Sequence, residues 1–398
     1  MLNLSIAFIC SFLATWLVVS SGALQCRFFL DRDLSGVQKN HAVAVPRVGG
    51  AAIVIASTIT VALSVFLGTS PTREALLLLC CSIPAFAGGL AEDLTKRVSP
   101  RTRLLCALGA ALAGCWALGG VATRVDSPII DDLLRFAPIA IGFTMITVAG
   151  LTNAINIIDG LNGLASVVTL LIFASICHVG YEVGDFLVAS FALVMIGAIA
   201  GFLLWNFPNA QIFLGDGGAY FIGFVMAELL IRLISRHPQV SAWYALVAIY
   251  PVFETIFSIY RRRILRGRSV SMPDGLHLHT LIYKRITRRG GTAAKPHQRT
   301  RRNSLASVYI WLLSLISIVP ATFFWRSPYV LAATALAFMV AYVWLYASIV
   351  QLRTPRWLKL ANSPALSHSA RQTSAIDAGI ANRGTVVAES DGASRGSD

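Results

Sequence analysis

Uncharged apolar runs of about twenty residues recur along the whole of this 398-residue chain. A helix needs about 20 apolar residues to cross the hydrocarbon core of a bilayer. Only 13% of the residues are charged, about half the share in soluble domains, so lipid must solvate the apolar surface. We therefore predict an all-α polytopic membrane protein with about eleven transmembrane helices. The predicted spans are residues 3–24, 47–68, 74–91, 103–121, 135–152, 160–179, 186–205, 217–235, 241–261, 305–325 and 328–350.

The first span and the end of the chain need separate interpretation. Residues 1–15 carry no Lys or Arg, whereas a signal peptide begins with a basic region, so we expect a retained first helix. The spans occupy most of residues 1–360, which we predict to form one transmembrane domain. Residues 361–398 are rich in Ser, Ala, Gly and Asp, and we expect them to form a disordered tail.

Lys and Arg are distributed unequally between the two sides that eleven spans define. All but six of the 33 lie on the side of the odd-numbered loops and the tail; the six are Arg73, Arg124, Arg135, Arg232, Arg236 and Arg326. Because cytoplasmic loops carry the excess positive charge, we predict the N-terminus outside and the C-terminus in the cytoplasm. Thirteen basic residues in 261–304 suit membrane lipids or a substrate. Nucleic acid is a poor interpretation, because no recognition module accompanies the charge.

The conspicuous polar segments all fall on this predicted cytoplasmic side. One of them, Glu92-Asp93 with Lys96, follows the third span. Adjacent carboxylates raise the pKa of one member, which can then act as a base near neutral pH. A solvated helix end with Lys96 as counter-charge is an equal alternative.

A row of amide and carboxylate side chains lies between the fifth and sixth spans. Asn153, Asn156, Asp159 and Asn162 recur every three residues and would share one face of a helical turn. Such a face could bind a sugar or a metal-bound diphosphate. Capping and turns would need only one such residue, so we favour binding.

An aspartate flanked by glycines precedes the eighth span, at Gly215-Asp216-Gly217. Glycines at a helix N-terminus allow a phosphate to approach the backbone closely, and Asp216 offers a hard oxygen ligand for Mg²⁺. An N-cap is an equal alternative for Asp216.

Histidines and one intramembrane carboxylate complete the polar set. His277 and His279, in the basic loop, could ligate a metal or donate to a phosphate, although such a surface pair is usually incidental. A zinc site is not expected without Cys or a third nearby His. Glu254 lies inside the ninth span, where a carboxylate is either functional or a hydrogen-bond partner between helices.

The first loop holds mixed cations before a glycine pair. Lys39, His41 and Arg47 suit an anionic headgroup, and they equally suit a loop on the positive side of a membrane.

These motifs together, in this order, resemble the polyprenyl-phosphate sugar-1-phosphate transferase superfamily, which includes phospho-N-acetylmuramoyl-pentapeptide transferase and the polyprenyl-phosphate N-acetylglucosamine-1-phosphate transferases. The resemblance covers about residues 30–350. Each motif is weak alone, but their order on an eleven-span frame is specific. The motifs are Lys39-x-His41, Pro46-Arg47-x-Gly49-Gly50, Glu92-Asp93-x-x-Lys96, Asn153-x-x-Asn156-x-x-Asp159-Gly160, Phe213-x-Gly215-Asp216 and His277-x-His279.

The resemblance implies an enzyme that transfers a sugar 1-phosphate, of the N-acetylhexosamine type, from a UDP-sugar to undecaprenyl phosphate and releases UMP. It implies Mg²⁺ dependence, with Mn²⁺ as an alternative. Asp216 would be a metal ligand together with Asp159, and Asp159 with Asn156 would belong to the nucleotide-sugar site. Glu92 and Asp93 would lie where the lipid phosphate is activated. The residues expected to contact the substrates are Lys39, His41, Arg47, Lys96, Asn153, Asn156, Asn162, Gly215, His277 and His279.

Three departures from the cell-wall pentapeptide transferases narrow the expectation. Glu92 stands where Asp is usual, Asn162 stands where they have Asp, and His277-Leu-His279-Thr lacks a further histidine. We therefore expect the branch that primes O-antigen or another surface polysaccharide, in the bacterial inner membrane with a cytoplasmic active site. A homodimer is compatible with this interpretation.

A transporter or flippase of an anionic lipid or metabolite is the alternative function. Transporters place polar residues near the bilayer midplane, often within internal repeats. Here the polar segments cluster on one side, and no repeat is evident between the halves of the chain.

Overall fold

The structure is a computed structural model that describes residues 1–21, 45–68, 72–265, 275–288 and 296–351. The chain divides into two compact units, Met1–Leu345 and Tyr346–Asp398. The predicted tail, residues 361–398, lies outside the described residues.

The described residues form α-helices and two short segments of other helical types, with no extended strand among them. The short segments are the 3₁₀-helix η2 (Ala242–Ala248) and the π-helix η3 (Arg261–Leu265). The α-helices are α1 (Leu2–Ser20), α2 (Gly49–Phe66), α3 (Thr72–Thr95), α4 (Pro100–Ala117), α5 (Pro128–Leu134), α6 (Ala137–Ile158), α7 (Leu164–Glu182), α8 (Phe186–Asn206), α9 (Gly215–Arg236), α10 (Ile249–Tyr260), α11 (Leu278–Arg288), α12 (Pro296–Phe323) and α13 (Pro328–Val350).

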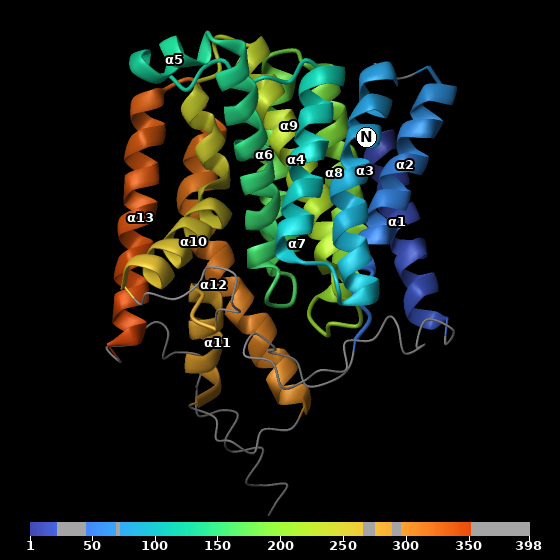
Figure 1. The fold of residues 1–398 in the computed structure, drawn as a ribbon. Helices are drawn as coiled ribbons and strands as arrows, with labels where there is room; N and C mark the ends of the chain where they lie inside the picture. Colours follow the sequence, from blue (N-terminus) through green and yellow to red (C-terminus); the bar gives the residue numbers. More distant parts are fainter. Residues whose placement is uncertain (22–44, 69–71, 266–274, 289–295, 352–398) are drawn as a thin grey trace, which may run out of the picture. The chain divides into compact units, whose positions relative to one another are not determined.

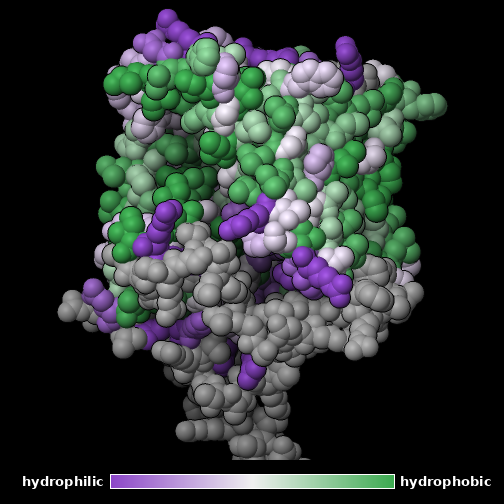
Figure 2. All heavy atoms as spheres, viewed as in Figure 1, coloured by the Kyte–Doolittle hydropathy of each residue, from purple (hydrophilic) through white to green (hydrophobic). Residues whose placement is uncertain are grey.

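Ten helical segments among the described residues are long and apolar enough to cross a membrane. This confirms the predicted all-helical membrane fold, and each of the eleven predicted spans contains a helix. The predicted span 103–121 corresponds to α4, which is not one of the ten because Arg101 and Arg103 lie in its first turn. Figure 2 shows an apolar belt across these helices, with hydrophilic residues above and below it.

Helix α9 is the central helix of the first unit. Of its 18-residue apolar window, 94% is buried, and it packs against α2, α3, α4, α6, α7 and α8. A helix that is apolar on all sides is expected to be enclosed by others, whereas the outer helices keep one face for lipid. The central position of α9 fixes what surrounds its first residue, Gly215.

Small residues let neighbouring helices approach α9 closely. A Cβ at Gly50 of α2 would overlap the backbone of Gly218, and a Cβ at Gly89 of α3 would overlap the backbone of Asp216. Small residues at helix contacts are typical of membrane proteins. These contacts lie at the end of the unit where α3 and α6 finish and where α2, α4 and α9 begin (Figure 1).

Candidate active site

The segments that precede α2 and α9 are hydrogen-bonded along their backbones. The Phe213 amide donates to the Pro46 carbonyl at 2.8 Å, and the Phe213 carbonyl accepts from the Gly49 amide at 3.0 Å. Two predicted motifs, 46–50 and 213–216, are therefore neighbours in space although far apart in the sequence.

The Asp93 carboxylate binds the N-terminus of α9 from the end of α3. Oδ1 accepts from the Asp216 amide at 3.0 Å, and Oδ2 accepts from the Gly217 amide at 2.8 Å. These amides lack partners within their own helix, and a carboxylate there also faces the positive end of the helix dipole. Gly215 has a φ of +78°, and a Cβ on it would overlap the Arg47 carbonyl and the Asp93 carboxylate. This junction therefore requires glycine.

The Asp216 side chain forms an ion pair with Arg103 of α4. Both side chains are largely buried, with 12% and 15% of their surface exposed. Arg103 is not among the site residues that the motifs predict. The signal available in the sequence is a basic residue in the first turn of the helix after Glu92-Asp93, at the same predicted end of the bundle.

Asp159 lies directly after the last residue of α6 and is half-buried. Burial raises the pKa of its carboxyl to about 6, although the Arg47 charge and a hydrogen bond from the Gly215 amide both lower it. Asp93, Asp159 and Asp216 therefore converge on the turn at Gly215. They come from three helices and have Arg47 and Arg103 beside them.

The carboxylates suit a magnesium ion that is held mainly by substrate. Among the described residues, no three His, Cys, Asp or Glu side chains are grouped so as to hold one metal. Mg²⁺ at phosphate sites is usually bound through one or two carboxylates and the substrate phosphates. Asp159 and Asp216 offer two such hard donors beside Gly215, whereas both oxygens of Asp93 accept from backbone amides. Arg103 supplies positive charge to Asp216.

The predicted row of four polar residues is interrupted, because α6 ends at Ile158. Asn153 and Asn156 remain on the helix and are half-buried; the Asn153 side-chain oxygen accepts from the Tyr220 hydroxyl at 3.5 Å. Asn162 does not share their helical face, which corrects that part of the prediction. It follows a turn and is buried against α12.

The contacts of Asn162 connect this turn to α12. Its side-chain amide donates to the Ser304 hydroxyl at 3.1 Å and to the Pro208 carbonyl at 3.3 Å. Its backbone amide donates to the Asn303 side chain at 2.8 Å, and its carbonyl accepts from the Ser307 hydroxyl at 2.7 Å. These bonds assign Asn162 to the packing of the loop on α12.

Glu92 and Lys96 lie at the turn after α3. A Glu92 carboxylate oxygen accepts from the Val98 amide at 2.8 Å, so this side chain closes its own turn and does not join Asp93 at α9. Lys96 is exposed and has a φ of +56°. Of the adjacent carboxylates predicted to act together, the structure brings only Asp93 to the Gly215 turn.

The two histidines are buried, with 6% of His277 and 2% of His279 exposed. Their rings are parallel, with centroids 5.4 Å apart. His279 lies against Gly160, where a Cβ would come within 2.6 Å of Nε2. The histidine motif therefore reaches the residue that follows Asp159, and it is not an incidental surface pair. Lys39 and His41 lie outside the described residues, so their roles stay predictions.

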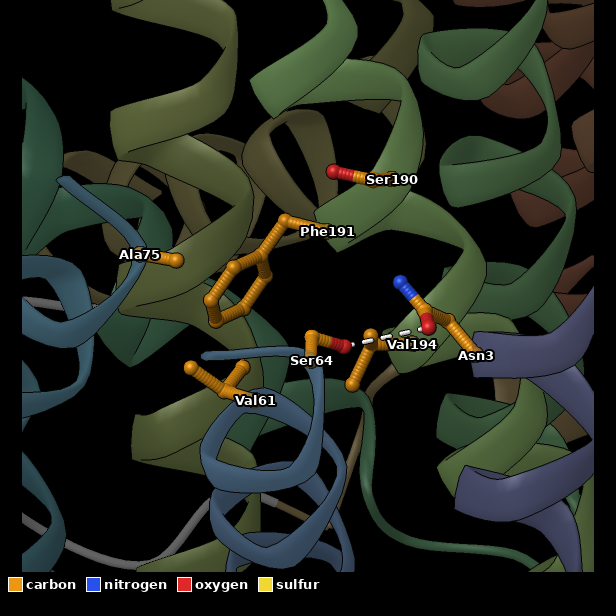
Figure 3. Close-up of a pocket in the computed structure, with 7 residues that line it drawn as sticks. All are labelled: Asn3, Val61, Ser64, Ala75, Ser190, Phe191 and Val194. Atoms are coloured by element: carbon orange, nitrogen blue, oxygen red, sulfur yellow. Dashed lines mark hydrogen bonds between the residues drawn. The ribbon is translucent and has the colours of Figure 1, made fainter. Parts of the chain in front are cut away.

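A small pocket lies at the opposite end of the unit, between α1, α2, α3 and α8 (Figure 3). Apolar side chains such as Val61, Phe191 and Val194 form most of its lining. Its polar residues include Ser64 and Asn3, which are joined by a hydrogen bond of 3.1 Å. It contains none of the carboxylates that converge on Gly215, and we do not place chemistry there.

Known proteins are similar to the part of the chain that holds the candidate active site. The family model described as glycosyl transferase family 4 matches residues 75–234, a stretch that includes Asp93, Asp159 and Asp216. A Bacillus subtilis protein described as "Probable undecaprenyl-phosphate N-acetylglucosaminyl 1-phosphate transferase" is 30% identical over 254 residues, covering 62% of this chain and 68% of that protein.

Two further relatives give similar results. A Thermotoga maritima undecaprenyl-phosphate alpha-N-acetylglucosaminyl 1-phosphate transferase is 30% identical over 265 residues, covering 65% of this chain and 74% of the relative. A Clostridium perfringens phospho-N-acetylmuramoyl-pentapeptide-transferase is 26% identical over 242 residues, covering 59% of this chain and 74% of the relative.

Proposed function

We propose, because this chain belongs to glycosyl transferase family 4, that it transfers an N-acetylhexosamine 1-phosphate from a UDP-sugar to undecaprenyl phosphate and releases UMP. The observation that carries the proposal is the convergence of three carboxylates and two arginines on the Gly215 turn, at one end of a membrane-spanning bundle. One substrate is soluble and the other is anchored in lipid, so they meet only where such an end faces water.

The reacting end lies, in this proposal, on the cytoplasmic side of a bacterial inner membrane. The distribution of Lys and Arg supports this side, because cytoplasmic loops carry the excess positive charge. Polar residues gathered at one end also fit a transferase better than a transporter, whose polar site lies near the midplane.

The proposed step is a direct displacement at phosphorus. An oxygen of the lipid phosphate forms a bond to the β-phosphorus of the UDP-sugar. The bond from that phosphorus to the bridging oxygen breaks, and UMP leaves with that oxygen. A phosphate monoester has a second pKa near 6, so at neutral pH the acceptor is already ionised and needs no side-chain base. In this proposal neither Glu92 nor Asp93 acts as a base.

The chain's own residues act in this step by positioning and by neutralising charge. Asp93 fixes the first residues of α9, which fixes where the Asp216 carboxylate lies. Asp216 and Asp159 would hold Mg²⁺, which neutralises phosphate charge when bound. Arg47 and, once released from Asp216, Arg103 would face the anionic phosphates of the two substrates.

We propose N-acetylglucosamine or a related N-acetylhexosamine as the sugar, for the start of O-antigen or another surface polysaccharide. Two of the relatives are named for N-acetylglucosamine 1-phosphate transfer. The departures at Glu92, Asn162 and the histidine motif favour the same branch.

The test is UMP release by the purified full chain in detergent, with Mg²⁺, undecaprenyl phosphate and single UDP-N-acetylhexosamines. We expect release that requires both the lipid and Mg²⁺. Asp216→Asn should lower it by roughly 100-fold or more, because charge stabilisation in the transition state is lost. Asp132→Asn, an exposed carboxylate at the opposite end, is the matched control and should leave turnover unchanged.

Two outcomes would contradict the proposal. Full turnover by Asp216→Asn at saturating Mg²⁺ would remove the metal assignment. If folded wild-type protein released no UMP with any donor, including deoxy-aminosugars, the enzyme assignment would fall and the transporter would become the leading function.

A further inference from the structure

Glu254 is a fully buried carboxylate, and each of its two oxygens accepts hydrogen bonds. Oε1 accepts from His277 Nδ1 at 2.9 Å and from the Leu278 amide at 3.3 Å. Oε2 accepts from the Tyr342 hydroxyl at 2.8 Å. One side chain on α10 therefore connects the start of α11 to α13.

The surroundings of Glu254 make its partners costly to lose. The rings of Phe253, Phe257 and Phe338 pack against Tyr342, so the carboxylate lies in an aromatic environment. A buried charge without hydrogen bonds or a counter-charge costs several kcal/mol. His277 is in contact with Glu254 and supplies one of these hydrogen bonds.

The backbone around the histidine motif is held by other contacts. The Arg261 guanidinium donates to the Leu276 carbonyl at 2.7 Å, and the Lys284 ammonium donates to the Gly275 carbonyl at 2.9 Å. These bonds place the main chain but do not orient an imidazole. The Glu254 contact does, because it engages Nδ1 and leaves Nε2 of His277 as the nitrogen available to a ligand.

The oriented histidine lies close to the Gly215 turn. The His277 ring is parallel to that of His279, which lies against Gly160, next to Asp159. A line of contacts thus runs from Glu254, inside a membrane-spanning segment, through His277 and His279 to Gly160, the residue that follows Asp159.

We propose that Glu254 is a positioning residue for His277. It accepts the Nδ1 proton and fixes the ring plane, so that the Nε2 edge of the imidazole has one defined orientation towards the candidate active site. A carboxylate that orients a functional histidine through its other nitrogen is a general device in enzymes and metal sites. The geometry stands by itself, and its consequence for turnover rests on the proposed function.

The first test reads the histidine directly and needs no turnover. The full chain, labelled with ring ¹⁵N-histidine and kept in detergent, is compared with His277→Gln to assign the His277 signals. We expect a protonated Nδ1 in the wild type and in Glu254→Gln, whose amide oxygen still accepts. In Glu254→Leu we expect a mixture of tautomers. An unprotonated Nδ1 in the wild type, or an unchanged signal in folded Glu254→Leu, would overturn the proposal.

The second test is a double-mutant cycle on UMP release. Glu254→Leu removes the acceptor of the Nδ1 proton and should lower kcat by roughly 10-fold or more, with a smaller effect on the KM for the UDP-sugar. In a His277→Gln background the same change should cost less than about 2-fold, because its effect passes through His277. Equal losses in both backgrounds would show a merely structural role.

Glu228→Gln is the matched control for removal of a buried carboxylate from a membrane-spanning helix. Glu228 is 3% exposed on α9 and lies beside Gly114 and Gly120, away from the histidines. We expect wild-type kcat and an unchanged His277 signal, and a kinetic defect equal to that of Glu254→Leu would count against the proposal. If the wild type lacked turnover, the proposed function would fail, whereas the ring ¹⁵N signals would still decide the role of Glu254.

Discussion

At the scale of single residues, the candidate site is a balance of charges around one glycine. Three carboxylates meet there, and each has a different partner: backbone amides for Asp93, Arg103 for Asp216, and Arg47 with the Gly215 amide for Asp159. Identical side chains therefore do different work, because their surroundings differ. Asp216 is the carboxylate whose partner is a charged side chain, Arg103, and a metal would have to displace it.

We expect Arg103→Gln to strengthen metal binding. Arg103 and a cation compete for the Asp216 carboxylate, and loss of Arg103 leaves this largely buried carboxylate without its counter-charge, so the Mg²⁺ concentration at half-saturation should fall by about 5-fold or more. The measurement is Mg²⁺-dependent thermal stabilisation of the purified protein, which needs no turnover. Arg135→Gln, at an exposed ion pair, is the control, and weaker Mg²⁺ binding by Arg103→Gln would contradict the competition.

At the scale of elements, the site is built from the ends of helices that a few close contacts bring together. The turn before α9 has room only for glycine at position 215, and the loop after α6 is held on α12 through Asn162. These contacts fix where the start of α9 and the end of α6 lie. The positions of Asp216 and Asp159, which the two helix ends carry, follow from this.

We expect Gly215→Ala to abolish turnover and to destabilise the fold. The φ of +78° costs a non-glycine residue about 1–2 kcal/mol, and the added Cβ would overlap Arg47 and Asp93. Thermal unfolding in detergent and UMP release measure the two effects. Gly142→Ala is the matched control, because its Cβ would meet nothing within 4 Å. Wild-type activity in Gly215→Ala would show that the turn is not required.

Asn162 and Asn156 should respond differently to alanine. Asn162→Ala removes buried hydrogen bonds to α12 and should cost about 1–3 kcal/mol of stability, with the KM for the UDP-sugar little changed. Asn156→Ala, at the half-buried end of α6, should raise that KM and leave the melting temperature nearly unchanged. The opposite pattern would return Asn162 to the binding face that the sequence predicts.

At the scale of the first unit, α9 has the candidate active site at its N-terminal end and a separate ion-pair cluster at its other end. There Arg232 donates to Asp185 at 2.9 Å and pairs with Glu74 at 2.8 Å, which joins α9 to α8 and α3. His237 also contacts Asp185 at 3.2 Å. Two ends of one buried helix are thus fixed independently.

We expect Asp185→Asn to lower stability by roughly 3–5 kcal/mol while the remaining folded protein keeps its turnover, because Arg232 would lose a buried partner. Burial raises the pKa of Asp185, but hydrogen bonds from Arg232 and Val188 outweigh it and hold that pKa below its usual range. The ion pair therefore stabilises the protein at neutral pH. Its contribution is lost only as the pH falls below about 3.9 towards the lowered pKa.

Thermal unfolding of Asp185→Asn against the wild type, at neutral and acidic pH, measures this contribution. Asp132→Asn, which loses an exposed pair with Arg135, should change the melting temperature little. Equal effects of the two substitutions would show that burial of the Asp185 cluster contributes nothing.

The sequence by itself determined the helical membrane class and which segments lie at which end of the bundle. Span length is set by the thickness of the bilayer, and a chain that crosses it repeatedly must place alternate loops on the same side. The sequence therefore predicts that motifs as distant as Pro46-Arg47 and Phe213-x-Gly215 lie on the same side of the membrane. The sequence motifs also single out Asp93, Asp159 and Asp216 as candidate site residues.

Only the tertiary structure decided which atoms meet. The rotation and packing of α3 direct Glu92 to the turn after that helix and Asp93 to the start of α9, although the two residues are adjacent in the chain. The same packing selects Arg103 as the partner of Asp216 and Glu254 as the partner of His277. The length of an apolar run determines whether a helix can cross the membrane. The partner of a polar side chain depends instead on contacts between distant segments, which no local sequence pattern specifies.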